Sequence, residues 1–351
     1  MKQKVLRLLA VVMTLALVLV GCGQQEDKGS ESKGSGEKSA KEVSVDIGML
    51  KLTSSAPLFI AIDKGFFEDE GIKANVKWFE AAQPIAVATA GGSVDVGATG
   101  ITASLYNMVA GGQKLWIVAD KGREAKGFSS SALLVPKDSS VSSPKDLKGK
   151  KIGITQTGST FHYMAGRILE KNGLSLKDVQ LVPLNSIQGL MEALKSKQVD
   201  AVILNEPNIS NVVAEGYGKV ITQVGDEMDY QTSGIFYSPK FADNKDAAVR
   251  FLKAYAKATR YYYDAVLTTK DGKVVPGKNY DEVVNIIAKY VDQDPELIKK
   301  GLPYMDPDGK LLEKDIQTQI DWYAKEKLID KAIDAKEIVN TKLLEDALKQ
   351  Q

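Results

Sequence analysis

The run Gly158-Ser159-Thr160 carries the sharpest chemical signal in this sequence. These small residues follow a predicted strand over 151–155 and precede a predicted helix over 161–172. The first amides of a helix lack partners within it, and the helix dipole adds positive potential, so this position favours an anion. A carboxylate, sulfonate or nitrate could bind there without a neutralising lysine. Because Ser and Thr also cap ordinary helices, the run alone leaves both interpretations open.

Glu206 is suited to a different contact. It follows a predicted strand over 199–204 and precedes Pro207, where a helix is expected to begin. In a cleft its carboxylate could accept a hydrogen bond from an amine or ring N–H of a ligand. Equally, in the first turn of a helix its negative charge could interact favourably with the helix dipole. Phe161 and Trp78 could stack on a ring, although aromatic residues more often pack in a core.

Strands and helices alternate from Val43 to Glu215, which predicts parallel βαβ units. The expected strands cover 43–49, 73–79, 94–99, 115–119, 151–155, 179–184 and 199–204, with helices over 58–64, 84–90, 102–110, 161–172, 187–197 and 207–215 between them. The signatures Gly71-Ile72 and Val94-Asp95 return as Gly173-Leu174 and Val199-Asp200. This repetition indicates one structural unit used twice.

Two extended segments, 130–135 and 233–237, flank the second unit and are interpreted as crossings between two lobes. The first lobe is expected to contain residues 43–135 and 233–351, and the second lobe residues 136–232. The last part of the chain should be helical over 246–267, 280–291, 296–301, 314–327 and 336–349, and these helices should pack on the first lobe. Two α/β lobes joined by two crossings would form a hinge.

Ligands of open parallel sheets bind beyond the carboxyl ends of the strands. Five loops meet this condition, over 51–57, 80–83, 100–102, 155–160 and 205–207, and they would line one cleft if the lobes face each other. The candidate ligand-binding residues in or beside these loops are Ser54, Ser55, Gln83, Gly100, Thr102, Gly158, Ser159, Thr160, Phe161, Asn205 and Glu206. The loop at 155–160 has neither the Gly-Lys-Ser/Thr of a P-loop nor a GxGxxG fingerprint, so nucleotide binding is unsupported.

The amino terminus predicts export and lipid anchoring. Lys2, Lys4 and Arg7 precede an apolar run over 8–20, which is short for a membrane-spanning helix. The run ends in Leu19-Val20-Gly21-Cys22, which resembles a bacterial lipobox. Residues 1–21 are therefore expected to be a signal peptide and Cys22 a lipidated residue. Residues 22–42 should form a disordered tether holding the body at the outer face of the cell membrane, with no other contact to the membrane.

Composition restricts the other classes of function. The 351 residues carry 46 basic and 45 acidic side chains, a net charge of +1, which gives no field to bind nucleic acid. One cysteine and one histidine exclude an intrachain disulfide and a Cys/His metal cluster, whereas a metal site made of carboxylates alone remains possible. We expect no metal and no cofactor. An enzyme would have to use His162 as its base with a serine of the cleft. We expect His162 to be a partly exposed helix residue instead.

Several motifs together resemble the nitrate/sulfonate/taurine-type periplasmic binding proteins, a group that also holds binders of thiamine pyrimidine precursors and riboflavin. The matching stretches are Lys51 to Pro57, Ile60 to Phe67, Gly71-Ile72, Gly92 to Asp95, Asp146 to Gly153, Gly158 to Thr160, Val199 to Ala201 and Glu206-Pro207. The resemblance implies the type II, or Venus-flytrap, form of the two-lobed α/β fold with two hinge crossings. By position it also implies that Ser54, Ser55, Gly100, Thr102, Gly158, Ser159 and Glu206 border the cleft.

The resemblance further implies a monomeric lipoprotein that captures a small organic solute and delivers it to an ABC permease and its ATPase, without catalysis. The solute could be an anion, a zwitterion or a heterocycle. Sulfonate and nitrate binders of the group often place a tryptophan where this chain has Gly100-Ile101-Thr102, which argues against those two ligands. A ligand-binding surface sensor and an enzyme acting in the same cleft remain the alternatives.

Overall fold

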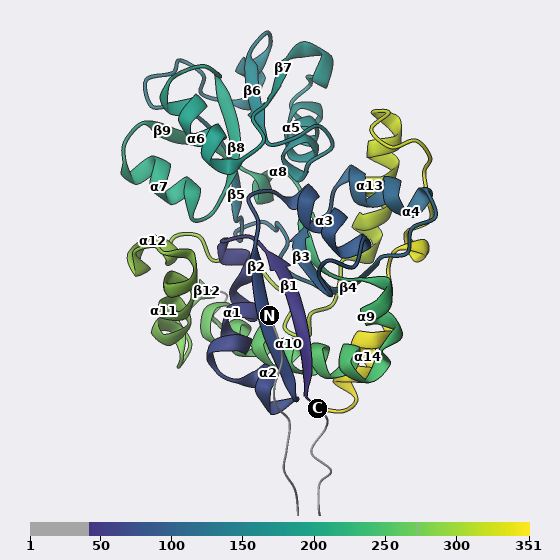
Figure 1. Ribbon diagram of the computed structural model, residues 1–351. Coiled ribbons are helices and arrows are strands. Elements are labelled where there is room, and N and C mark those ends of the chain that lie inside the picture. The colour runs from purple at the N-terminus through teal and green to yellow at the C-terminus, as the bar shows by residue number, and fades with distance from the viewer. Residues whose placement is uncertain (1–41, 272) are drawn as a thin grey trace, which may run out of the picture. The chain divides into compact units, whose positions relative to one another are not determined.

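The computed structural model describes residues 42–351 except Gly272 (Figure 1). The predicted signal peptide, the predicted lipidation site Cys22 and all of the predicted tether except Glu42 lie outside the described residues. Within the described part of the chain, no helix has the length and apolar character needed to span a bilayer.

The first sheet has five strands in the order β2-β1-β3-β10-β4. β1 runs parallel to β2 and β3, whereas β10 lies antiparallel between β3 and β4. The strands are β1 (Val43–Met49), β2 (Ile72–Trp78), β3 (Val96–Gly100), β4 (Trp116–Asp120) and β10 (Ser233–Tyr237). They alternate with η1 (Thr53–Ser55), α1 (Ala56–Asp63), α2 (Phe66–Asp69), α3 (Ala82–Ala90) and α4 (Ala103–Ala110).

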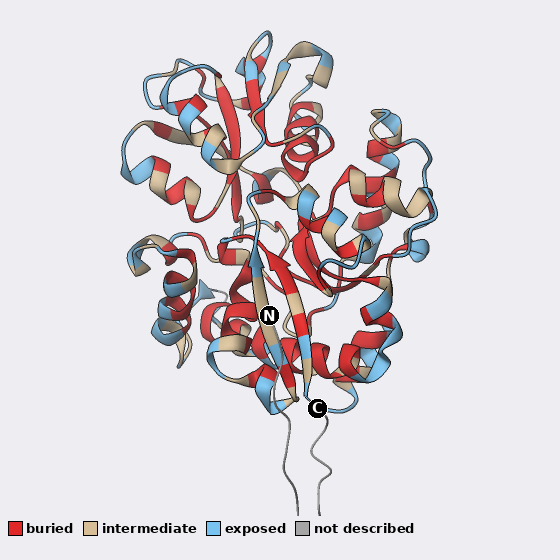
Figure 2. Ribbon diagram, viewed as in Figure 1, coloured by how far each residue is buried: buried red, intermediate tan, exposed pale blue. Residues whose placement is uncertain are grey.

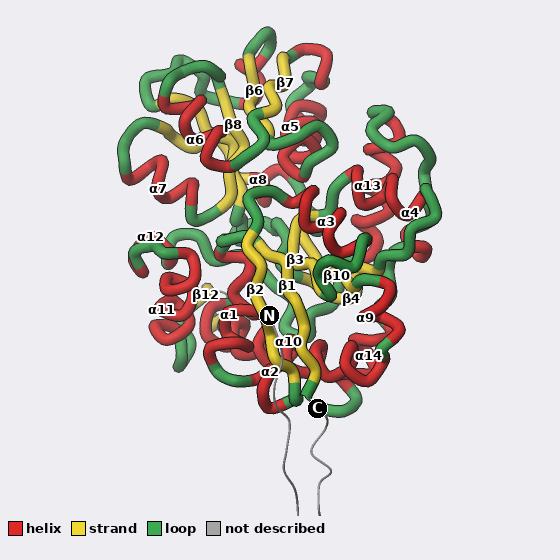
Figure 3. Tube along the Cα trace, viewed as in Figure 1, coloured by secondary structure: helices red, strands yellow, loops and turns green. Residues whose placement is uncertain are grey.

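The second sheet also has five strands, in the order β7-β6-β8-β5-β9. β6 runs parallel to β7 and β8, and β5 lies antiparallel between β8 and β9. The strands are β5 (Ser131–Pro136), β6 (Lys151–Ile154), β7 (Gln180–Pro183), β8 (Ala201–Asn205) and β9 (Gly218–Gln223). The helical elements are η2 (Pro144–Leu147), α5 (Thr160–Lys171), η3 (Leu176–Asp178), α6 (Ile187–Lys195), α7 (Asn208–Ala214) and α8 (Val224–Glu227). The matching order of the two sheets, drawn in yellow in Figure 3, confirms the predicted repeat of one unit.

The boundary between the lobes differs from the predicted one. Residues 131–135 were assigned to the first lobe, but they pair with β8 and β9 as β5, inside the second sheet. The crossings instead contain residues 121–130 and 228–232, where Glu124 and Tyr230 exchange backbone hydrogen bonds of 2.8 and 3.1 Å. An apolar extended segment fits either sheet, so its sequence pattern could not decide. We propose that residues 43–130 with 233–351 form the first lobe and residues 131–232 the second.

The rest of the chain is largely helical. It contains α9 (Pro239–Asp243), α10 (Lys245–Val266), the short strands β11 (Thr269–Lys270) and β12 (Lys273–Val274), α11 (Tyr280–Val291), α12 (Pro295–Ile298), α13 (Glu313–Lys325), η4 (Ala335–Glu337) and α14 (Lys342–Leu348). The helix predicted over 336–349 is interrupted. Ile117 in β4 accepts a hydrogen bond from Asn340 N and donates one to Ile338 O, so a bridge to the edge of the first sheet separates η4 from α14.

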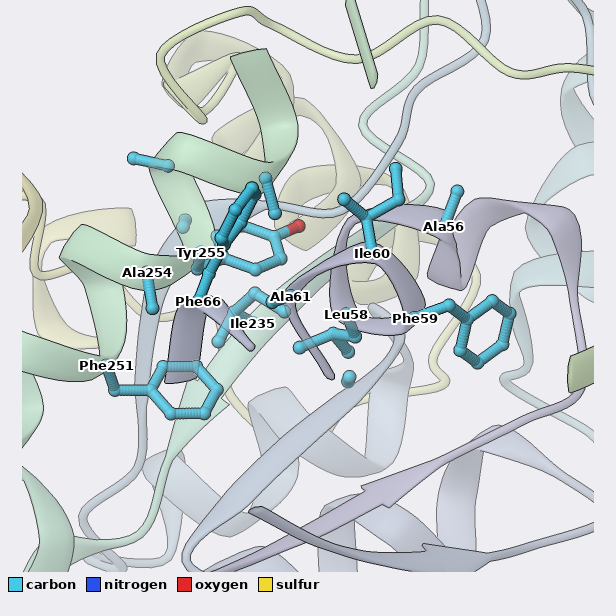
Figure 4. Close-up of a cluster of buried hydrophobic side chains, with 14 of the residues drawn as sticks. Ala56, Leu58, Phe59, Ile60, Ala61, Phe66, Ile235, Phe251, Ala254 and Tyr255 are labelled. Atoms are coloured by element: carbon cyan, nitrogen blue, oxygen red, sulfur yellow. The ribbon is translucent and has the colours of Figure 1, made fainter. Parts of the chain in front are cut away.

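The core of the first lobe lies between its sheet and the helices α1 and α10. Phe59 stacks on Tyr290 at 4.7 Å between ring centroids, and Phe67 packs against Phe251 at the same separation. Figure 4 shows part of this cluster, and Figure 2 shows that the central strands of both sheets are largely buried. α10 also reaches the sheet with a polar group, since the Tyr255 hydroxyl donates to the carbonyl of Asp120 at 2.7 Å. The long helix therefore fixes the carboxyl end of β4.

The sequence predicts that the C-terminal helices pack on the first lobe. In the structure, one of them, α13, also packs on the second lobe. The ring of Trp322 in α13 lies 5.0 Å from the ring of Tyr163 in α5, and the Tyr323 hydroxyl donates to Ser159 O at 3.2 Å. Lys325 forms an ion pair with Glu170 at 2.7 Å. α13 therefore contacts the second lobe directly.

Candidate functional site

A cavity lies where loops of the two lobes meet, and it holds about 580 Å³ of atom-free space, part of it open to solvent. The first lobe and the crossings contribute Leu50, Leu52, Ser54, Ala81, Ala82, Thr99, Gly100, Lys121, Gly122, Ser130, Thr232 and Ser233. The second lobe contributes Thr155, Thr160, Phe161, Ile187 and Asn205. Most of these residues follow the carboxyl ends of strands, where parallel sheets bind their ligands.

The cavity brings together part of the predicted site, namely Ser54, Gly100, Thr160, Phe161 and Asn205. The sheet order explains this meeting. β1 and β3 are neighbours in the first sheet, and β6 and β8 are neighbours in the second, so the loops after them emerge side by side. Gly100 approaches the second lobe so closely that a Cβ built on it would lie 2.6 Å from Thr160 Cγ2. The two lobes are in direct contact at the cavity.

Other predicted residues do not line the cavity and have partners elsewhere. The Ser55 hydroxyl donates to Leu50 O at 3.0 Å, and the hydroxyls of Thr102 and Ser104 share a hydrogen bond of the same length. Gln83 lies in the first turn of α3, away from the lining. These residues shape the loops around the site rather than its surface.

The predicted anion position at the start of α5 is partly occupied by the chain itself. Gly158 N donates to His162 Nδ1 at 3.0 Å, and Ser159 Oγ caps the helix by accepting from His162 N at 3.2 Å. The carbonyl of Gly158 accepts from Ala103 N of the first lobe at 2.9 Å. Of the three residues Gly158, Ser159 and Thr160, only Thr160 lines the cavity.

Glu206 also lies outside the cavity lining. Its carboxylate accepts hydrogen bonds from Ser210 N at 3.0 Å and Ser210 Oγ at 3.1 Å, and a Cβ built on Gly301 would lie 2.0 Å from its Cγ. Burial raises the pKa of this carboxyl. The structure thus pairs the Glu206 carboxylate with Ser210 in the first turn of α7 and leaves it outside the cavity lining.

His162 is more buried than the sequence analysis expected, with 5% of its surface exposed. Its ring meets that of Trp322 edge-on at 6.0 Å, and burial lowers its pKa to about 4. Its Nε2 has no hydrogen-bond partner among the described residues. Since His162 does not line the cavity, it is not placed to act as the base for a serine of the cleft.

Lys121 is a cavity residue that sequence reasoning missed. It follows β4 directly, lines the cavity and is 1% exposed. Its Nζ donates to Ser54 Oγ at 2.9 Å, its one hydrogen bond to a described residue, and no carboxylate within residues 42–351 forms an ion pair with it. Burial lowers its pKa to about 7, against the attraction of nearby Asp120. The strand-end rule applied to residues 115–119 could have found this lysine.

The neighbouring carboxylate of Asp120 does not neutralise Lys121 by direct contact. Asp120 Oδ1 accepts from Gly122 N and Gln231 Nε2, both at 2.7 Å, and Oδ2 accepts from Asp306 N at 2.8 Å. Burial raises the pKa of Asp120. With the Tyr255 hydroxyl on its carbonyl, Asp120 holds the backbone that presents Lys121 to the cavity.

The remaining lining gives the cavity a polar and an apolar part. Hydroxyl and amide groups come from Ser54, Thr99, Ser130, Asn205 and Thr232, and Thr99 Oγ1 is buried with no partner in the described chain. The apolar surface comes from Leu50, Leu52, Ala81, Ala82, Phe161 and Ile187. A molecule with one anionic group and an apolar remainder matches both parts. The described residues contain no group of His, Cys, Asp and Glu side chains suited to a metal ion.

Two sheets of equal order, two crossings and a cavity between the lobes define the class of two-lobed substrate-binding proteins. The type II fold predicted from the sequence is confirmed. Residues 52–265 match the family described as NMT1/THI5 like, and the chain belongs to this family. This finding also confirms the resemblance stated above.

Relatives and solved structures agree with this assignment. A protein of Bacillus subtilis (strain 168), whose name places it among aliphatic sulfonates-binding proteins, is 28% identical over 362 aligned positions, covering 100% of this chain and 98% of its own length. The alkanesulfonate-binding protein SsuA from Xanthomonas axonopodis pv. citri, bound to MOPS, has a TM-score of 0.70 at 21% identity, over 86% of this chain and 99% of its own. The periplasmic nitrate-binding protein NrtA from Synechocystis PCC 6803 has a TM-score of 0.73 at 16% identity, over 88% and 89%. At these identities the two structures show the fold.

Proposed function

We propose that this protein is a solute-binding lipoprotein that captures a small organic anion outside the cytoplasm and delivers it to an ABC importer. It is held at the membrane through lipids on Cys22, works as a monomer with a permease and an ATPase as partners, and performs no catalysis. The observation that carries the proposal is the buried Lys121, whose ammonium group borders the cavity without a carboxylate partner in the described chain.

A buried cation is costly unless it is paired, and its desolvation favours the neutral form. An anionic ligand would supply the missing partner and use the donors of Lys121 that Ser54 leaves free. The apolar lining then favours a ligand whose remainder is hydrocarbon. Sulfonates combine these features, and the name of the Bacillus subtilis relative points to the same class. Sulfonate binders of this group often have a tryptophan where this chain has Gly100-Ile101-Thr102. We propose a sulfonate despite the missing tryptophan, because Lys121 provides a charge for the ligand.

Substituting Lys121 tests this proposal. Lys121→Met preserves volume but removes the charge, so it should weaken binding of short alkanesulfonates by about 2 kcal/mol or more, at least about thirtyfold in Kd. The melting temperature without ligand should stay the same or rise, because the buried charge is gone. Calorimetric titration of sulfonates, carboxylates, amines and sugars measures the first effect and thermal unfolding the second.

Lys114→Met is the matched control, since Lys114 is an exposed lysine of the same lobe that does not line the cavity. It should bind anions as the wild type does. Equal anion affinity in Lys121→Met and the wild type, or tight binding of amines and sugars alone, would overturn the proposed ligand class. Turnover of a bound ligand by the wild type would overturn the assignment as a binder.

A further inference from the structure

A second recess adjoins the cavity, with about 730 Å³ of atom-free space that includes open solvent. The two spaces share Leu50, Leu52 and Ile187 in their linings. Leu50 and Leu52 are 6% and 8% exposed. These three side chains therefore form an apolar collar between the cavity beside Lys121 and this recess. We call this recess the outer pocket.

The outer pocket presents aromatic surface from the end of β2. Trp78 and Phe79 both line it, and Trp78 is 41% exposed, the largest side chain among the exposed hydrophobic residues of the described chain. Lys51 Nζ lies 5.7 Å from the centre of the Trp78 ring. Pro207 of the second lobe and Val291 at the end of α11 complete the apolar part of the lining. An exposed indole in a recess, joined to a ligand cavity, offers a contact that water satisfies poorly.

We infer that the outer pocket is a second subsite, which receives the apolar tail of an elongated amphiphilic anion. This inference rests on the proposed function, since it requires the acidic group of the ligand to lie at Lys121. From there the hydrocarbon passes the collar of Leu50, Leu52 and Ile187 and ends against Trp78. The inner cavity sets the preference for an anion, and the outer pocket sets the preference for tail length.

The charges that line the outer pocket favour a ligand with an apolar tail over a ligand with a second acidic group. Lys51 and Glu80 both line the outer pocket, are exposed and have opposite charge, so the recess has no excess of either sign from these side chains. The fully buried cation lies in the inner cavity. A ligand with acidic groups at both ends would leave one of them beside Trp78 and Phe79 without a buried cation.

The inference predicts how affinity depends on chain length. A short n-alkanesulfonate fills only the inner cavity. Once the chain passes the collar, each added methylene is removed from water against Trp78, and the affinity should rise by about twofold to fourfold per carbon, the upper value being that of full burial. The part of the tryptophan emission that is lost in Trp78→Phe, which keeps Trp116 and Trp322, should change only with the longer members of the series.

The experiment measures Kd by calorimetry for n-alkanesulfonates of two to eight carbons, with tryptophan fluorescence in parallel. Trp78→Ala should leave ethanesulfonate affinity within about twofold and remove most of the gain from the longer chains. Trp78→Phe should keep the gain, because it restores an aromatic face. Val87→Ala is the control, since Val87 is an exposed apolar residue on α3 that lines neither space.

The outcomes separate this inference from the proposed function. If ethanesulfonate binds through Lys121 but affinity does not depend on chain length, or depends on it equally in Trp78→Ala, the outer subsite is overturned while the proposed function stands. If neither sulfonates nor carboxylates bind the wild type, both fail. If Trp78→Ala unfolds, the chain-length series and the fluorescence of the wild type still decide.

Discussion

At the scale of single residues, the proposed site centres on a lysine whose environment opposes its charge. Lys121 is enclosed by the crossings and the first lobe, and Asp120 beside it is held by Gly122, Gln231 and Asp306. Burial therefore determines the protonation of Lys121, and its pKa falls to about 7. A bound anion would favour the charged form and raise this pKa again.

Binding of a sulfonate should consequently weaken as the pH rises above about 7. Below that pH the ammonium group is already charged without ligand. Above it, binding must also take up a proton, so Kd should increase by up to tenfold per pH unit until the pKa of the bound form is reached.

Calorimetry at pH 5.5 and 8.5, in buffers of different ionisation enthalpy, measures this proton uptake directly. Uptake should be near zero at the lower pH and approach one proton at the higher. Ser54→Ala retains the lysine and should retain the dependence. A sulfonate Kd that is the same at both pH values would mean that Lys121 does not titrate with binding.

At the scale of elements, the same sheet order in both lobes places equivalent strand ends at the cavity. The end of β3 in the first lobe faces the start of α5 in the second, and Gly100 and Thr160 meet there. Only a residue without a side chain leaves room for this contact. Gly100 is thus explained by the closeness of the two lobes rather than by its backbone conformation.

Gly100→Ala should hinder this approach. The added methyl group would lie 2.6 Å from Thr160 Cγ2, and overpacking of this kind costs about 1–3 kcal/mol, which corresponds to roughly fivefold or more in Kd. The double variant Gly100→Ala/Thr160→Ser removes the clashing methyl group and should recover most of the affinity. Titration of both variants with one sulfonate compares them, and an unchanged Kd for Gly100→Ala would show that ligand binding does not require this contact.

At the scale of the whole molecule, three connections join the lobes in addition to the contacts at the cavity and between Gly301 and Glu206. Two are the crossings, which exchange hydrogen bonds between Glu124 and Tyr230. Glu124 also accepts from Ser129 Oγ, Ser130 N and Ser130 Oγ, and Ser130 lines the cavity. The third is α13, through the contacts of Trp322 and Tyr323 with α5. We propose that the lobes open at the cavity about this joint and close on the ligand.

A bound sulfonate should therefore compact and stabilise the protein. Small-angle scattering should record a smaller radius of gyration with ligand than without it. At a ligand concentration of 100 times Kd, unfolding should cost about 2.7 kcal/mol more, which raises the melting temperature by a few degrees. Lys121→Met at the same ligand concentration is the comparison, and with a Kd at least about thirtyfold higher it should gain no more than about 0.9 kcal/mol and compact less. Scattering curves that are identical with and without ligand, together with clear binding, would argue for a rigid cavity.

The sequence by itself determined most of the elements and the general position of the site. Hydrophobic periodicity located β1, α5 and α11, and the repeated glycine and Val-Asp signatures indicated two equivalent units. The rule that ligands bind beyond strand ends found Ser54, Gly100 and Asn205. These features depend on patterns over a few residues, which the local sequence contains in full.

Only the tertiary structure decided which polar groups face the cavity. Lys121 donates a hydrogen bond to Ser54, which lies 67 positions away in the sequence, and Ser159 O accepts one from a tyrosine 164 positions away. The Glu206 carboxylate accepts from the nearby Ser210, and Gly301 packs against its side chain. The membership of β5 in the second sheet likewise depends on its partners β8 and β9. Burial and pairing are properties of residues distant in sequence, and a lysine becomes a buried cation only when the lobes enclose it.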